Sequence, residues 1–188
     1  SDLRFELTKK GITFDYHNTM PFTIDGKLRS GVFELEGDVS SQYVTGLLFA
    51  LPLLDGDSEI RMLSKLESKP YVDLTIACLR HFGIAVQETE QGYAVAGGQQ
   101  YHACDLTVEG DYSQAAFFCV ANALGSDITL TNLNPESVQG DKKIVEIVRE
   151  MCYNREQGLP AGFTVDAADI PDLVPILAVL ATFGTAPS

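Results

Sequence analysis

The stretch Glu-Gly-Asp-Val-Ser-Ser-Gln at residues 36–42 recurs farther along the chain as Glu-Gly-Asp-Tyr-Ser-Gln at residues 109–114. A short strand pattern precedes each copy, at residues 32–35 and 106–108. Self-similarity of this kind indicates a fold made of repeated supersecondary units. The repeat therefore predicts that one α/β motif occurs more than once in this chain.

Each copy continues with the same order of elements. A helix pattern comes next and meets a glycine placed to cap its end; a β-rich stretch and a second helix follow. In the first copy these features are a helix over 41–54, Gly56, a strand over 60–63, and a helix over 71–82 between Pro70 and Gly83. In the second copy they are a helix over 113–124, Gly125, a strand over 128–131, and a helix over 141–151 that follows Ser137.

A third copy is expected to begin at residues 165–166, with a helix over 171–183 closed by Gly184. A strand pair is expected near residues 84–86 and 93–95. Helices that repeatedly alternate with strands predict a layered α/β architecture. Because no Gly/Ser-rich linker separates the copies, we expect the chain to pass from one lobe to the next in a tight crossing near residues 109–111.

Composition narrows the classes of function. The chain has 188 residues and a net charge of −13, with only 13 Lys and Arg, which argues against a nucleic-acid partner. No apolar run reaches the length of roughly 18 residues that a membrane span needs, so we expect a soluble, cytoplasmic protein. The four cysteines form no CxxC pair and the three histidines show no metal-ligand spacing, so reduced thiols and no metal site are expected.

Two helix starts carry hydroxyl groups that could serve a ligand. The junction between a predicted strand and a predicted helix contains Ser40, Ser41 and Gln42. The start of the next predicted helix is flanked by Ser68 and Tyr71. The free N–H groups and the dipole of a helix N-terminus favour an anion, and serine hydroxyls add donors. Simple N-capping explains the same serines equally well, and Tyr71 could stack on a ring or pack in the core.

A carboxylate near the end of the chain is a further candidate. Asp172 follows Pro171 in the first turn of the last predicted helix, where a negative charge is electrostatically favourable. Aimed into a cleft, it could instead accept a proton from a substrate hydroxyl. Both readings stay open from these residues alone.

Taken in order, five short motifs resemble the 5-enolpyruvylshikimate-3-phosphate (EPSP) synthase family. The resemblance runs from about residue 21 to residue 184 and covers less than half of a typical family member; residues 1–16 match poorly. The motifs lie at residues 37–42, 68–73, 109–111, 139–141 and 170–172.

The resemblance implies a fold of two lobes, each made from βαβαββ units around inward-facing helices, an inverted α/β barrel that is incomplete here. Residues 1–108 would belong to the first lobe and residues 109–188 to the second. The implied reaction transfers an enolpyruvyl group from phosphoenolpyruvate to the 5-hydroxyl of shikimate 3-phosphate, without metal or organic cofactor, in a monomer.

The resemblance also implies roles for individual residues. Ser40, Ser41 and Ser68 would donate to the 3-phosphate, and Gln42 would reach both substrates. Tyr71 would lie along the shikimate ring, and Asp172 would accept the proton of the 5-hydroxyl.

Several basic family residues that clamp phosphoenolpyruvate have no matching position in this chain, which explains its shortage of cations. Two other readings therefore remain. One is the related UDP-N-acetylglucosamine enolpyruvyl transferase, and binding of a nucleotide sugar to the chain would favour this reading. The other is a folded, non-catalytic chain that binds the phosphorylated substrate without turning it over, which an assay of phosphate release would distinguish.

Overall fold

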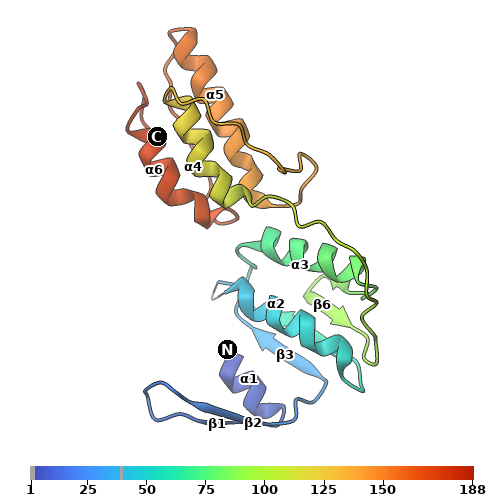
Figure 1. Cartoon of the computed structure of the whole chain (residues 1–188). Helices are drawn as coiled ribbons and strands as arrows, with labels where there is room; N and C mark the ends of the chain where they lie inside the picture. The colour runs from blue at the N-terminus through green and yellow to red at the C-terminus, as the bar shows by residue number, and fades with distance from the viewer. Residues whose placement is uncertain (1–2, 39) are drawn as a thin grey trace. The chain divides into compact units, whose positions relative to one another are not determined.

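The computed structural model describes residues 3–38 and 40–188 (Figure 1). Val39 of the repeated stretch and residues 1 and 2 lie outside the described residues. The chain divides into two compact units, of which the first ends at Asp105 and the second begins at Leu106. Each unit is described by itself.

The first unit contains one complete βαβαββ motif, as the repeat predicts. Its four strands form one sheet in the order β3-β4-β6-β5. The strands β3 and β4 are parallel, whereas β6 pairs antiparallel with both β4 and β5. In chain order the elements are β3 (Val32–Leu35), α2 (Ser41–Ala50), β4 (Ser58–Met62), α3 (Lys69–His81), β5 (Gln87–Thr89) and β6 (Gly92–Val95).

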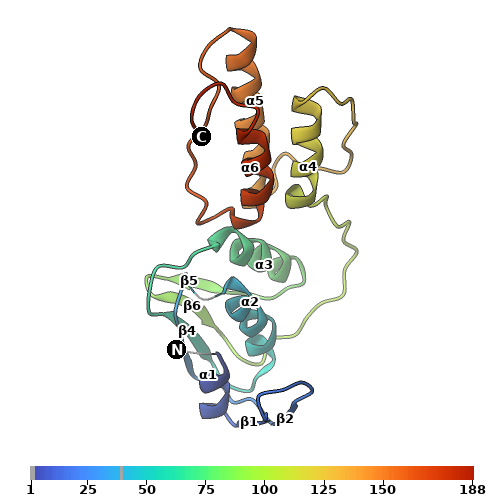
Figure 2. The ribbon, with the colours of Figure 1, turned by 90° about the vertical axis from the view of Figure 1, so that its left-hand side faces the viewer.

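Both helices of the motif pack on one face of this sheet (Figures 1 and 2). Alternate strand residues point toward them, because successive side chains of a strand face opposite sides. The strands contribute Phe33, Leu35, Ile60, Tyr93 and Val95 to the core, and all five are at most 2% exposed. The helices meet them with a second buried set: Val44, Leu47, Leu48, Val72 and Leu79.

A helix and a hairpin precede this motif: α1 (Leu3–Lys9), β1 (Ile12–Asp15) and β2 (Thr23–Gly26), with β1 and β2 antiparallel. A helix followed by two antiparallel strands is also the order of α3, β5 and β6. The last three elements of the βαβαββ motif therefore occur twice in the first unit. The helix α1 lies against β3, where the buried Glu6 carboxylate accepts a hydrogen bond from the backbone N–H of Glu34 at 3.2 Å.

In the first unit, the helix and strand boundaries expected from the sequence lie close to the observed ones, with two differences. The helix over 41–54 divides into α2 and a 3₁₀ turn, η1 (Leu51–Leu53), where Pro52 has no N–H to continue the α-helical pattern. The strand expected at 84–86 begins at Gln87 instead. The side-chain amide of Gln99 binds both the N–H and the C=O of Ala85, which takes the place of a neighbouring strand.

The second unit consists of helices and 3₁₀ turns in its described residues. The elements are α4 (Tyr112–Ala123), η2 (Gly140–Lys143), α5 (Ile144–Glu156), η3 (Pro171–Leu173) and α6 (Val174–Ala181). Buried apolar residues from all three α-helices form one core. The central members are Ala116, Val120, Ile144, Ile147, Met151, Leu177 and Leu180.

The strands expected at 106–108 and 128–131 do not form, and side-chain amides again explain why. Asn132 donates through its side chain to the carbonyl of Val108 at 3.0 Å. Asn122 binds both the N–H and the C=O of Ile128, each at 2.8 Å. These backbone groups therefore have partners without a β ladder.

Two of the four expected glycine caps are confirmed by a left-handed backbone, Gly83 with φ of 83° and Gly125 with φ of 107°. Gly56 and Gly184 do not adopt that conformation. None of the helices in the described part of the chain has both the length and the apolar character needed to cross a membrane.

Candidate functional site

The starts of α2 and α3 lie side by side at the carboxyl ends of the parallel strands β3 and β4. Beyond the strands, the N–H of Leu63 donates to the carbonyl of Leu35 at 2.8 Å, and the N–H of Glu67 donates to the carbonyl of Gly37 at 2.9 Å. A third bond joins the N–H of Gly37 to the hydroxyl oxygen of Ser64 at 2.8 Å. The loops that lead into the two helices are therefore in direct contact, at the edge where open α/β sheets bind ligands.

At the start of α2, the N-capping interpretation of Ser40 is confirmed. Its hydroxyl oxygen accepts from the N–H of Gln42 at 3.2 Å, and its backbone is extended. The hydroxyl proton is still available to a second acceptor, because a hydroxyl both donates and accepts. Ser41 is half-buried, and its side chain makes no hydrogen bond with another described residue; Gln42 is exposed.

At the start of α3, Ser68 adopts an unusual backbone. Its φ of 57° and ψ of 31° lie in the left-handed region, and its side chain makes no capping hydrogen bond. The other described non-glycine residues with positive φ are both asparagines, Asn18 and Asn132, a residue type that tolerates this region. Tyr71, half-buried, lies in the first turn of α3.

Two lysines lie near these helix starts, and only one has a free charge. Lys69 pairs with Asp73 at 2.6 Å and with Glu88 at 3.3 Å. Partial burial opposes protonation of Lys69, but the hydrogen bond and charge of Asp73 outweigh it and raise the pKa of the ammonium group. Lys65, in the loop between β4 and α3, is exposed and forms no ion pair with another described residue. The sequence patterns pointed to neither Lys65 nor its neighbour Ser64.

The second copy of the repeat fills the corresponding region with its own side chains. The Glu109 carboxylate accepts from the hydroxyl of Ser137 and from the side-chain amide of Gln139. Burial opposes ionisation of Glu109, yet the hydrogen bonds from Gln139 and Ser137 prevail and lower its pKa. Asp111 caps α4 through the N–H groups of Ser113 and Gln114. In this copy, carboxylates bind the donors at the helix start, whereas in the first copy the hydroxyl of Ser40 caps α2.

Asp172 belongs to the second unit. It lies in the first turn of η3, and its side chain is exposed. The structure thus brings together the five predicted substrate-binding residues within the first unit: Ser40, Ser41, Gln42, Ser68 and Tyr71. The predicted role of Asp172 as a base remains a prediction.

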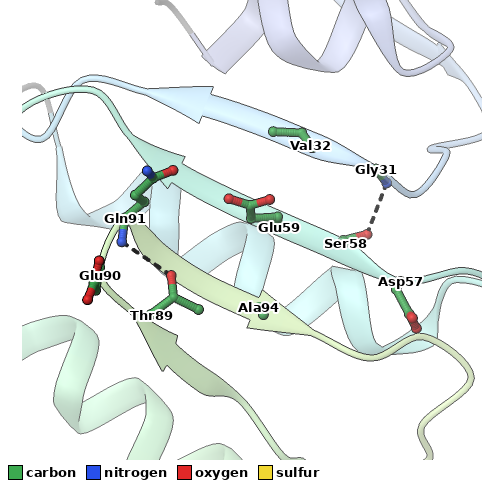
Figure 3. Close-up of a pocket in the computed structure, with 9 residues that line it drawn as sticks. All are labelled: Gly31, Val32, Asp57, Ser58, Glu59, Thr89, Glu90, Gln91 and Ala94. Atoms are coloured by element: carbon green, nitrogen blue, oxygen red, sulfur yellow. Dashed lines mark hydrogen bonds between the residues drawn. The ribbon is translucent and has the colours of Figure 1, made fainter.

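A hollow of about 640 Å³ opens on the other face of the sheet (Figure 3). Its lining includes three carboxylates, from Asp57, Glu59 and Glu90, and no basic side chain. Carboxylates repel a phosphate group, so this hollow is not suited to the ligand that the helix starts favour. The candidate site is therefore the pair of helix starts.

The βαβαββ motif places this chain in the class of layered α/β proteins. Within that class, the family model for EPSP synthase (3-phosphoshikimate 1-carboxyvinyltransferase) matches residues 5–188. The chain belongs to this family. The match begins at residue 5, so the resemblance extends farther toward the N-terminus than the expected start near residue 21.

Curated relatives agree with the family model. The chain is 45% identical over 174 residues to the 3-phosphoshikimate 1-carboxyvinyltransferase of Clostridium novyi, which covers 87% of this chain and 40% of that protein. It is 46% identical over 173 residues to the enzyme of the same name from Clostridium kluyveri, with 87% and 41% covered. The Methanococcus maripaludis enzyme of that name is 40% identical over 183 residues, with 89% and 43% covered. The chain therefore spans about 40% of the length of the curated relatives it matches.

A solved structure shows the same fold. The EPSP synthase of Acinetobacter baumannii superposes with a TM-score of 0.60 at 22% sequence identity, over 79% of this chain and 33% of that one. The expected fold class is confirmed: a mixed α/β structure that matches part of an EPSP synthase.

Proposed function

We propose that this chain supplies the shikimate 3-phosphate site of an enzyme that transfers an enolpyruvyl group from phosphoenolpyruvate to the 5-hydroxyl of that substrate. The observation that carries the proposal is the contact between the loops that lead into two helix starts with serine hydroxyls. Membership of the EPSP synthase family indicates which phosphorylated ligand such a site serves.

The proposed phosphate site uses three hydroxyls and two helix N-termini. Ser40, Ser41 and Ser68 donate to the 3-phosphate, and each hydrogen bond to a charged group contributes about 1.5–3 kcal/mol. Each helix N-terminus adds about 0.3–1 kcal/mol. The exposed ammonium group of Lys65 belongs to the same loop as Ser68 and adds positive charge near the site.

The remaining proposed roles concern the ring and the reacting 5-hydroxyl of shikimate 3-phosphate. Tyr71, in the first turn of α3, lies along the ring, and Gln42 reaches both substrates. Asp172 accepts the proton of the 5-hydroxyl as the oxygen of that hydroxyl bonds to C2 of phosphoenolpyruvate. In the same addition the double bond between C2 and C3 opens, and C3 takes up a proton from a general acid to become a methyl group. Phosphate then leaves C2 and a proton leaves the new methyl group, which restores the double bond.

For the 188-residue chain alone, we propose binding without turnover. Enzymatic rates come from a fully assembled, charge-complementary cleft. The chain spans about 40% of its relatives and carries a net charge of −13, whereas the second substrate, phosphoenolpyruvate, is a compact polyanion that requires cations. Release of phosphate clearly above background by the purified chain would contradict this proposal.

Calorimetry tests the binding site directly. We expect weak binding of shikimate 3-phosphate, little binding of shikimate, and none of UDP-N-acetylglucosamine. The double change Ser40→Ala with Ser41→Ala should abolish the preference for the phosphorylated ring. Ser113→Ala is the matched control, because this helix-start serine already bonds to Asp111 in the second copy. Equal affinity for shikimate and its 3-phosphate would overturn the assignment, and tight binding of the nucleotide sugar would favour the related transferase.

Two further properties belong to the proposal. All four cysteines are free thiols, which supports a reducing, cytoplasmic location; recovery of the native protein outside the cytoplasm would contradict it. A monomer is expected, and sedimentation analysis that found a stable dimer at micromolar concentration would contradict that part.

A further inference from the structure

Two serine hydroxyls extend the pairing of β3 and β4 at opposite ends of the strands. Within the strands, the register pairs Val32 with Glu59 and continues to Leu35 with Met62. In the same register, the N–H of Gly37 donates to the Ser64 hydroxyl oxygen at 2.8 Å beyond the carboxyl ends. At the amino ends, the N–H of Gly31 donates to the Ser58 hydroxyl oxygen at 3.3 Å (Figure 3). The same type of bond therefore occurs next to the candidate site and far from it.

The contact next to the site depends on a glycine. Gly37 is buried, and a Cβ atom at this position would press on the Lys65 carbonyl group and lie 2.7 Å from the carbonyl oxygen of Ser64. The two loops approach each other so closely only because residue 37 has no side chain. Any larger residue would push residues 36–38 away from the loop of residues 63–68.

The contact between Gly37 and Ser64 lies close in the chain to both helix starts that carry serines. The carbonyl of Gly37 accepts from the N–H of Glu67 at 2.9 Å, and the next residue is Ser68 in its left-handed conformation. On the other side, Gly37 lies three residues before the N-cap of α2, Ser40. The contact between Ser64 and Gly37 thus joins the loop that leads to Ser68 to the segment that leads to Ser40 and Ser41.

We propose that Ser64 and Gly37 are positioning residues that hold the serines of the two helix starts at the spacing one phosphate group requires. The inference rests on the proposed function for its ligand, although the spacing itself is a property of the free chain. Without the Ser64 hydroxyl, the loop of residues 63–68 moves more freely relative to α2. The hydroxyls of Ser40, Ser41 and Ser68 then reach one phosphate together less often.

Three variants and two ligands test the role in binding. Ser64→Ala removes the bond next to the site, Ser64→Thr keeps the hydroxyl, and Ser58→Ala removes the matching bond at the far ends of the strands. By calorimetry, we expect Ser64→Ala to weaken shikimate 3-phosphate binding by about three- to tenfold, the usual effect of one net hydrogen bond. The much weaker binding of shikimate should be affected less, because it has no phosphate to span the two helix starts. Ser64→Thr should retain most of the affinity for shikimate 3-phosphate, and Ser58→Ala should bind it as the unmodified chain does.

A second measurement tests the spacing without any ligand. In amide NMR spectra of the free chain, Ser64→Ala should shift the signals of Gln42 and Ser68, and Ser58→Ala should leave both in place. Gly37→Ala should shift them further, and Ser64→Ala provides the test if that chain fails to fold.

The outcomes separate the two claims. If Ser64→Ala leaves the signals of both helix starts unchanged, or if Ser64→Ala and Ser58→Ala weaken phosphate binding equally, the positioning role is refuted. If the signals shift as expected but the unmodified chain shows no preference for the phosphorylated ring, the positioning role is supported and the proposed function fails.

Discussion

At the scale of single residues, Ser68 is held in a backbone conformation that a residue with a side chain rarely adopts. A left-handed conformation costs an L-residue roughly 1–2 kcal/mol relative to the right-handed region. Such strain persists only where surrounding contacts enforce it, and it concentrates at functional sites. Here the hydrogen bond from Glu67 to Gly37 holds the residue that precedes Ser68, which supports the proposed role of Ser68 as a phosphate donor.

A pair of substitutions separates the strain from the hydroxyl. Ser68→Gly and Ser68→Ala both remove the side-chain donor, but glycine accepts the left-handed backbone without strain. We expect the glycine variant to be more stable than the alanine variant by about 1 kcal/mol, while both lose phosphate-dependent binding to the same extent. Urea denaturation and calorimetry measure the two effects. Equal stability of the variants would show that the left-handed backbone carries no strain.

The sequence pointed to the hydroxyl-bearing residues of the site, and the recurring stretch includes Gly37, but no pattern indicated the contact of Gly37 with Ser64. Ser40 and Ser68 carry a recognisable signal, because serine at a helix start is a known pattern. Ser64 and Gly37 act through a contact between two loops that are adjacent only after β3 and β4 pair in parallel. A pattern read along the chain contains no signal for such a contact.

At the scale of elements, the two copies of the repeat treat their helix starts differently. The first copy begins α2 with an uncharged serine cap, whereas the second begins α4 with the Asp111 carboxylate and adds Glu109 between Ser137 and Gln139. A helix N-terminus favours a negative charge. The first copy carries the matching carboxylates Glu36 and Asp38, yet Ser40 rather than a carboxylate caps α2. This difference supports the proposal that the start of α2 receives a negative charge from a ligand.

The lowered pKa of Glu109 predicts how stability depends on pH. A carboxyl group whose folded pKa lies below its ordinary value of about 4.3 stabilises the fold above that pH and stops doing so as the pH falls through the folded value. We therefore expect Glu109→Gln to unfold at a lower temperature than the unmodified chain at pH 7, with a difference that narrows below about pH 4. Thermal unfolding between pH 7 and pH 3 measures this. A difference that stays constant over that range would mean that the charge of Glu109 is not involved.

Helices were predicted better than strands, and the reason is physical. Both long helices of the first unit, and α4 and α5 of the second, lie close to their expected positions because each shows an apolar face and a defined start. The strands expected at 84–86, 106–108 and 128–131 fail where Gln99, Asn132 and Asn122 bind the backbone through their side-chain amides. Which backbone an amide side chain binds depends on the folded chain, so apolar alternation alone overestimates the β content.

At the scale of the whole molecule, the proposed reaction requires both units. The phosphate-binding serines lie in the first unit, before Asp105, and Asp172 lies in the second. The sequence repeat anticipated that the chain has two parts, and residues 1–108 and 109–188 remain our proposed assignment to two lobes of an enzyme. Catalysis by Asp172 would therefore depend on residues far apart in the sequence.

The role of Asp172 is testable in a chain of the family's full length. We expect Asp172→Ala to lower turnover by about 100-fold or more, the usual effect of losing a general base, while KM for shikimate 3-phosphate changes little. Asp169→Ala is the matched control, because Asp169 is also exposed and precedes the same turn. Normal turnover of the Asp172→Ala enzyme, or an equal loss in both variants, would remove Asp172 from the mechanism.

The buried Glu6 carboxylate affects whether a further strand can pair with β3 at the edge of the sheet. β3 is an outer strand, and outer strands expose N–H groups that recruit extended segments from other chains. At Glu34 that donor is already bound by Glu6, and α1 lies against the same strand. An incoming peptide would have to displace α1 and break the hydrogen bond between Glu6 and Glu34, so this edge of the sheet is protected against β-augmentation.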